Sequence, residues 1–193
     1  MLYYILKVIA VPIFSLLFLP KIKGRENIPK TGSVIVYSNH TSFLDPIILG
    51  CFLPRKVYFM AKKELFRYRL FGAFLNKLGA FPVNRGKADI SAIKQALQIL
   101  KKGKVFGIFP EGTRNKTGDL KSFAHGVASI AHHSKAVTVP VAITGGYRLF
   151  KPIRIIIGKP VDFNNFYDRK SSTEVLEKMS EKMSRELLEI LSS

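Results

Sequence analysis

Apolar residues fill the start of the chain almost without interruption. Between positions 2 and 19 only Lys7, Pro12 and Ser15 break the run. No basic stretch precedes this segment and no small-residue cleavage site follows it, which argues against a secretory signal peptide. A helix of this length measures roughly 27 Å, barely the thickness of the hydrocarbon core. We therefore predict a membrane anchor over residues 1–20 that is embedded in one leaflet or crosses the bilayer, with the Lys7 ammonium at the interface.

A first helix buried in a soluble core is the alternative interpretation of this segment. It would place the Lys7 ammonium inside the fold without a partner, which is costly. The basic residues Lys21, Lys23 and Arg25 follow the segment directly. By the positive-inside tendency they predict that the rest of the chain lies on the cytoplasmic face of the cell membrane, as a monotopic or single-pass protein.

After residue 20 the hydrophobic pattern alternates between strands and helices. Short runs of β-branched and aromatic residues predict strands over 33–38, 56–61, 80–83, 104–109, 136–143 and 154–157. Longer stretches with helical apolar spacing predict helices over 45–53, 64–78, 88–102, 123–133 and 172–191. Buried strands that alternate with helices are typical of an α/β fold with a mostly parallel central sheet flanked by helices. No repeat or linker divides residues 21–193, so we expect them to form one α/β domain.

The net charge and the cysteine content narrow the classes of function. The chain has 31 Lys and Arg against 13 Asp and Glu, a formal net charge of +18. Such a surface favours an anionic partner, which nucleic acid, anionic lipid or a phosphorylated substrate could each supply. The single cysteine, Cys51, excludes an internal disulfide framework and a zinc site built on paired cysteines, and no histidine spacing predicts a metal site.

Two polar loops follow predicted strands and carry the candidate chemistry. Residues 39–45 hold His40 and Asp45, and residues 110–115 hold a Glu-Gly-Thr-Arg sequence. In α/β sheets the chemistry collects at the carboxyl ends of the strands. On a straight helix a five-residue step would separate the His40 and Asp45 side chains by roughly 140°, so they can meet only if the segment is a turn. Asp45 would then hold one ring nitrogen and leave the other free as a base.

Other interpretations of these two residues stay open at this point. Asp45 could serve only as the cap of the helix that begins before Pro46, with His40 an ordinary polar residue of the loop. The sequence argues against a serine-nucleophile site and a nucleotide-binding P-loop. The chain has no GxSxG elbow for a serine nucleophile, and its glycine spacing does not fit a P-loop.

Four blocks of sequence together resemble a known family. They are NHTSFLD at 39–45, GAFPVNR at 79–85, FPEGTRN at 109–115 and VPV at 139–141. On these blocks the chain resembles the glycerophospholipid acyltransferases and, among them, the bacterial 1-acyl-sn-glycerol-3-phosphate acyltransferases. Pro82 and Asn84 depart from the second block, where many members have an aliphatic residue and an aspartate.

The resemblance implies an enzyme that moves an acyl chain from acyl-ACP or acyl-CoA to the sn-2 hydroxyl of lysophosphatidic acid, giving phosphatidic acid. It implies that His40 is the general base, that Asp45 orients it, and that transfer is direct, with no acyl-enzyme and no cofactor beyond the acyl donor. The residues implied to hold the phosphate and glycerol of the acceptor are Arg85, Glu111, Gly112, Thr113 and Arg114. Those implied to line the acyl and thioester side are Val139, Pro140 and Val141, for which an ordinary buried strand is the alternative.

Basic and aromatic residues interleave between positions 62 and 74 and predict a membrane-binding surface. They are Lys62, Lys63, Phe66, Arg67, Arg69, Phe71 and Phe74. We expect anionic membrane lipids as the partner of this surface and no nucleic acid. Two alternatives to the favoured function remain: an acyltransferase for another lysophospholipid or a lyso-aminolipid, and a membrane-tethered protein that binds nucleic acid.

Overall fold

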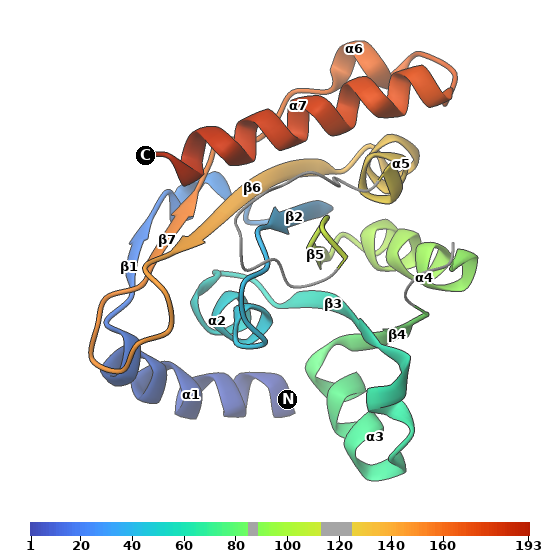
Figure 1. Ribbon diagram of the computed structural model, residues 1–193. Coiled ribbons are helices and arrows are strands. Elements are labelled where there is room, and N and C mark those ends of the chain that lie inside the picture. Colours follow the sequence, from blue (N-terminus) through green and yellow to red (C-terminus); the bar gives the residue numbers. More distant parts are fainter. Residues whose placement is uncertain (85–88, 113–124) are drawn as a thin grey trace.

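The computed structural model describes residues 1–84, 89–112 and 125–193, and in this part of the chain seven strands form one sheet (Figure 1). The order across the sheet is β1-β7-β6-β2-β5-β3-β4. Five neighbouring pairs run parallel and the β6–β7 pair runs antiparallel, so the sheet is mixed. The strands are β1 (Lys21–Lys23), β2 (Val34–Ser38), β3 (Val57–Lys62), β4 (Ala80–Val83), β5 (Val105–Ile108), β6 (Val137–Thr144) and β7 (Arg154–Ile157).

Helices cover both faces of this sheet. They are α1 (Leu2–Phe18), α2 (Asp45–Phe52), α3 (Arg69–Leu78), α4 (Ile90–Lys101), α5 (His125–Ser134), α6 (Asn164–Tyr167) and α7 (Thr173–Leu191), with the 3-10 turns η1 (Arg25–Asn27) and η2 (Lys63–Phe66). Helices α4, α5 and α7 pack on one face, while α1 and α2 lie on the other (Figure 1). The prediction of an α/β fold with a central sheet flanked by helices is confirmed.

Strand β2 shows why the central strands are continuous apolar runs in the sequence. All of its residues are buried, because helices cover both faces of the sheet. Ile35 and Tyr37 belong to the core beneath α4, α5 and α7, whereas Val34 and Val36 belong to the core beneath α1 and α2. The loop that follows Ser38 therefore leaves the carboxyl edge of the sheet near its middle, between β5 and β6.

Helix α1 lies against the body of the fold and is packed along one side only. Its residues Tyr3 and Phe18 are buried, and the Tyr3 hydroxyl donates to the carbonyl of Gly50 in α2 at 2.8 Å. The Lys7 ammonium donates to the carbonyl of Leu53, at the end of α2, at 2.6 Å. Burial lowers the pKa of Lys7. Lys7 thus has a partner inside the fold, which corrects the expectation that packing this helix against the body would leave it unpaired. No helix within residues 1–84, 89–112 and 125–193 combines the length and the apolar character needed to cross a membrane.

The predicted helix over residues 64–78 is divided into two elements. The turn η2 ends at Phe66 and α3 begins at Arg69, and the two pack against each other. Gly72 permits this approach, because a Cβ at its position would lie 3.1 Å from both the Cα and the carbonyl oxygen of Phe66. The sequence pattern does not predict β1 or α6, since β1 holds a single apolar residue between two lysines and the one turn of α6 is too short to show a helical period.

Candidate active site

The loop after β2 brings His40 and Asp45 together. The Asn39 side chain fixes the start of this loop, because its amide donates to the carbonyl of Ile143 at 2.9 Å and its oxygen accepts from the Ile143 N–H at 2.8 Å. His40 Nδ1 lies 2.8 Å from Asp45 Oδ2. The segment between them is a turn, which is the condition under which the sequence allows the two side chains to meet.

Asp45 organises this turn as well as the imidazole. Its Oδ2 accepts from the N–H groups of Thr41 and Ser42, each at 2.8 Å. The carboxyl group is completely buried and stands at the first residue of α2, where no side-chain cap is formed. Asp45 therefore holds the residues that precede it, which argues against the interpretation that it serves only as a helix cap.

The His40 ring is fixed on its flat side by an aromatic stack. Its centroid lies 4.2 Å from that of Phe109, with the planes 20° apart, and Phe109 stacks in turn on Phe59 at 5.8 Å. A carboxylate at Nδ1 selects the tautomer with the proton on that atom, so the Nε2 lone pair is free. The arrangement can accept a proton from a group that approaches Nε2.

Glu111 lies against the backbone of His40. Its Oε1 accepts from the His40 N–H at 3.2 Å, while Oε2 is buried without a hydrogen-bond partner among the described residues. Burial raises the pKa of Glu111. Gly112, the next residue, has φ of 65° and closes the turn with its N–H on the carbonyl of Phe109 at 3.0 Å. The loop after β5 thus meets the loop after β2 at the predicted site.

Tyr147 is a member of the site that the sequence analysis does not identify. Its hydroxyl donates to Asp45 Oδ1 at 2.5 Å. The residue follows β6 and lies 102 positions from Asp45 in the chain. No sequence motif surrounds Tyr147, so the sequence alone does not identify it as a site residue.

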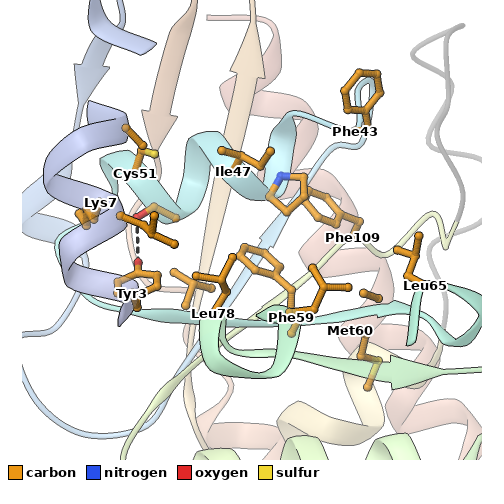
Figure 2. Close-up of a pocket in the computed structure, with 18 of the residues that line it drawn as sticks. Tyr3, Lys7, Phe43, Ile47, Cys51, Phe59, Met60, Leu65, Leu78 and Phe109 are labelled. Carbon is orange, nitrogen blue, oxygen red and sulfur yellow. Dashed lines mark hydrogen bonds between the residues drawn. The ribbon is translucent and has the colours of Figure 1, made fainter. Parts of the chain in front are cut away.

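An apolar cavity of about 520 Å³ starts at His40 and runs between α1, α2, α3 and β3. Its volume falls in the range of small-molecule sites. Figure 2 shows Tyr3, Lys7 and Cys51 at one end, and Phe43 and Phe109 at the other. The polar atoms at the end near Tyr3 have partners: the Tyr3 hydroxyl donates to the carbonyl of Gly50 and the Lys7 ammonium to that of Leu53. Burial raises the pKa of Tyr3 to about 12 and also raises the pKa of the Cys51 thiol. The cavity therefore presents hydrocarbon and uncharged groups over most of its length.

The other predicted site residues fall into two groups, one outside the described part of the chain and one inside the sheet. Arg85, Thr113 and Arg114 lie outside the described residues. Val139, Pro140 and Val141 are buried within β6, inside the packed sheet, and none of the three lines the cavity. Their position matches the alternative of an ordinary buried strand.

The predicted membrane-binding residues gather on η2, α3 and the end of β3. Lys62 lines the cavity, and Phe71 and Phe74 are exposed on α3. Lys63, Arg67 and Arg69 are exposed beside them, while Phe66 is half-buried. Of the elements that carry these residues, α3 contacts α1, and η2 packs against α3.

Three comparisons with known proteins agree with one another. The acyltransferase family model matches residues 20–144. The 1-acyl-sn-glycerol-3-phosphate acyltransferase of Bacillus subtilis (strain 168) is 37% identical over 176 residues, which cover 88% of this chain and 87% of that protein. The enzyme of the same name from Streptococcus pneumoniae is 32% identical over 159 residues, and the match covers 79% of this chain and 58% of the relative.

A solved structure has the same fold. It is the crystal structure of the 1-acyl-sn-glycerophosphate (LPA) acyltransferase, PlsC, from Thermotoga maritima. The superposition has a TM-score of 0.68 at 29% identity and covers 90% of this chain and 73% of that one.

Proposed function

Because this chain belongs to the acyltransferase family, we propose that it transfers an acyl chain from a thioester to the sn-2 hydroxyl of 1-acylglycerol 3-phosphate, giving phosphatidic acid. The observation that carries the proposal is the His40–Asp45 pair, joined at 2.8 Å, at one end of an apolar cavity. A base next to a hydrocarbon-lined site fits a reaction that joins a hydroxyl to a fatty acyl group.

The proposed mechanism is a direct transfer. His40 Nε2 takes the proton of the acceptor hydroxyl as its oxygen attacks the thioester carbonyl carbon. The tetrahedral intermediate then expels the thiolate, and His40 returns the proton to sulfur. Asp45 holds Nδ1–H and stabilises the imidazolium formed between these steps, as in the hydrolase triads. Phe109 keeps the ring from rotating out of line.

The cavity is proposed to hold the acyl chain. Its walls at Phe59, Leu75 and Leu78 are apolar, and it extends from the base to Cys51. A chain whose thioester carbonyl lies beside His40 would bury its methylenes along this path, at about 0.8 kcal/mol each. Acyl-ACP and acyl-CoA carry the same thioester and are both anionic, so either donor fits the site and the net charge of +18.

The acceptor is proposed to bind on the side of the β5 loop. Glu111 and Gly112 meet the His40 loop there, and an exposed glycine at positive φ allows close approach of a ligand to the backbone. Arg85, Thr113 and Arg114 are proposed to complete the phosphate site, because guanidinium groups bind phosphate oxygens in pairs. Anionic membrane lipids are proposed as further partners of the basic surface around Lys63.

The protein is proposed to act as a monotopic enzyme on the cytoplasmic face of the cell membrane. Helix α1 keeps one face on the body of the fold and exposes the apolar residues Tyr4, Ile5, Val8, Ile9, Ile13 and Leu16 on the other. An exposed apolar face of this kind, followed in the chain by the cations Lys21, Lys23 and Arg25, favours the interface of an anionic bilayer.

The test is transfer by the purified protein in mixed micelles. Labelled lysophosphatidic acid is incubated with acyl-CoA or acyl-ACP, and phosphatidic acid is separated and counted. We expect product with at least one donor, and a loss of at least roughly a hundredfold for His40→Ala with lipid binding retained. Product only from another lysophospholipid or a lyso-aminolipid would reassign the acceptor. No product with any of these acceptors, from a protein that is folded, would overturn the proposal.

A further inference from the structure

The buried carboxyl group of Asp45 uses its two oxygens differently. Oδ2 receives three donors, all from the short loop that precedes it: His40 Nδ1 and the N–H groups of Thr41 and Ser42. Oδ1 receives the hydroxyl of Tyr147, which comes from the connection between β6 and β7. Among the described residues, Tyr147 is thus the group that joins this carboxylate to a distant part of the chain.

Tyr147 is itself held by the end of α1. Its ring packs edge-on against Phe18, with centroids 5.5 Å apart and planes at 90°. The same connection is pinned to α1 by its backbone: the N–H of Phe150 donates to the carbonyl of Leu17 at 2.7 Å, and that of Ile153 to the carbonyl of Phe18 at 2.9 Å. In Figure 1 the loop between β6 and β7 lies beside the end of α1. The position of the hydroxyl is therefore set by contacts that do not involve the His40 loop.

The hydroxyl acts as a permanent donor. Burial and the hydrogen bond to Asp45 both raise the pKa of Tyr147, so the phenol keeps its proton at any pH at which the enzyme works. If Asp45 Oδ1 turned away from the Tyr147 hydroxyl, this buried donor would lose its hydrogen-bond partner, which is costly. Rotation of the carboxylate, and with it of the imidazole, is restrained at both oxygens.

From this geometry we propose that Tyr147 is a positioning residue, which acts through Asp45 to hold His40 in the orientation needed for proton transfer. The inference rests on the proposed function, because it assigns His40 the role of the base. It adds a third member to the pair and ties that member to the helix that we propose binds the membrane.

The proposal also predicts the direction of an electrostatic effect. A hydroxyl that donates to Asp45 draws negative charge away from the oxygen that faces His40, so its removal leaves more charge to stabilise the imidazolium. The other ionisable groups near the pair stay in place: Glu111 of the β5 loop contacts the His40 backbone, and Lys7 and Lys62 line the cavity that starts at His40. Loss of the hydroxyl therefore raises the pH at which the His40 ring loses its proton.

The first test is the kinetics of Tyr147→Phe, which keeps the ring on Phe18 and removes only the oxygen. We expect kcat to fall about tenfold with little change in KM for either substrate, since the variant loses alignment and no substrate contact. The acid limb of the pH–rate profile should move up by about half a pH unit. The matched control is Tyr167→Phe, whose hydroxyl donates to the backbone carbonyl of Ala136 far from the site and which should change neither quantity.

The second test does not depend on turnover. The titration of the His40 ring is followed by NMR in the wild type and in Tyr147→Phe, with the His40 signal identified by its loss in His40→Ala. An upward shift of the midpoint in Tyr147→Phe supports the inference even if no acceptor is turned over, in which case it is the proposed function that fails. An active wild-type enzyme whose kcat, acid limb and His40 titration are all unchanged by Tyr147→Phe would overturn the inference and leave the proposed function standing.

Discussion

A carboxylate without solvent exposure is tolerated in a fold only when its oxygens are hydrogen-bonded, and Asp45 meets this condition with four donors. Breaking a buried ionic pair by removing one partner typically costs about 3–5 kcal/mol, because the other charge is left uncompensated. The same contacts that stabilise the turn also orient His40. Stability and proposed catalysis are therefore coupled at this residue, and a variant that tests one must preserve the other.

The substitution Asp45→Asn separates the two roles as far as one residue allows. The amide keeps the size of the side chain and one oxygen, which can still accept from the turn N–H groups and from Nδ1–H, but it loses the negative charge that stabilises the imidazolium. We expect kcat to fall by at least roughly a hundredfold. We expect Tm to fall by only a few degrees, about the effect of an ordinary substitution. Transfer assays and thermal unfolding on the same preparation measure both. Retention of more than about a tenth of the activity would contradict the role given to Asp45.

Glu111 makes the stability of the fold depend on pH. Since burial raises the pKa of Glu111, the folded protein keeps this proton to a higher pH than the unfolded chain does. The resulting stabilisation is fully present below the unfolded pKa and is lost as the pH rises through the folded pKa. Glu111→Gln cannot ionise, so we expect it to raise Tm at about pH 8 and to change it little at about pH 4.

Scanning calorimetry at the two pH values provides this measurement, with the exposed Glu26→Gln as the matched control. Glu26→Gln should change Tm by the same small amount at both pH values. If Glu111→Gln changed Tm equally at low and high pH, burial would not raise the pKa of the Glu111 carboxyl group, and the prediction would be wrong.

At the scale of elements, the sequence predicts those parts of the site that lie within a single block. His40 and Asp45 fall in one stretch of seven residues, so their spacing alone predicts a turn that joins them. Phe109 and Glu111 fall in another such stretch, but only the structure shows that the Phe109 ring stacks on His40 and that Glu111 contacts its backbone. Tyr147 and the inner wall of the cavity depend on how α1 and the β6–β7 connection pack, which no local pattern encodes.

At the level of elements, too, the local pattern misses tertiary contacts. The period of a helix continues through residues 64–78, yet the close approach at Gly72 lets η2 fold against α3 and divides the segment. The hydrophobic run of α1 predicts a membrane segment but does not reveal that Tyr3 and Lys7 reach the carbonyls of Gly50 and Leu53. Tertiary contacts decide both cases, and they override local propensity.

The element α2 yields a prediction on acyl-chain length. Cys51 is buried where the cavity meets α1, so a larger side chain there would shorten the space available to a chain. We expect Cys51→Leu to shift the preferred acyl donor toward shorter chains, and the matched Cys51→Ala to keep or lengthen it. Competition between donors of graded length, with the products resolved by mass spectrometry, gives the profile. Identical profiles for wild type and both variants would place the acyl chain elsewhere.

At the scale of the whole molecule, charge and exposed apolar residues lie on a common side. Helix α1 contacts α3, where Leu70 is 88% exposed and Phe71 is also exposed, and η2, which holds Lys63 and lies between Lys62 and Arg67 in the chain, packs against α3. Residues of α1, η2 and α3 also line the cavity, so a protein bound through this side would meet its proposed lipid substrates at the bilayer surface. On the opposite face of the sheet, α7 carries most of the acidic residues of the C-terminal part of the chain.

This asymmetry predicts how the protein binds membranes. The double variant Val8→Asp, Leu70→Asp places charge at two sites that are 73% and 88% exposed, one on α1 and one on α3, and should not disturb the core. We expect its sedimentation with anionic vesicles to fall well below that of the wild type, because each burial of a leucine-sized side chain contributes about 1.5–3 kcal/mol and the new carboxylates are repelled by the lipid.

The matched control is Leu188→Asp, which changes an exposed apolar residue on α7 and should bind like the wild type. Added salt should weaken wild-type binding only in part, since screening acts on the basic residues Lys62, Lys63, Arg67 and Arg69 and not on the apolar contact. Complete release of the wild type by salt, or equal binding by all three proteins, would refute insertion of this side into the bilayer.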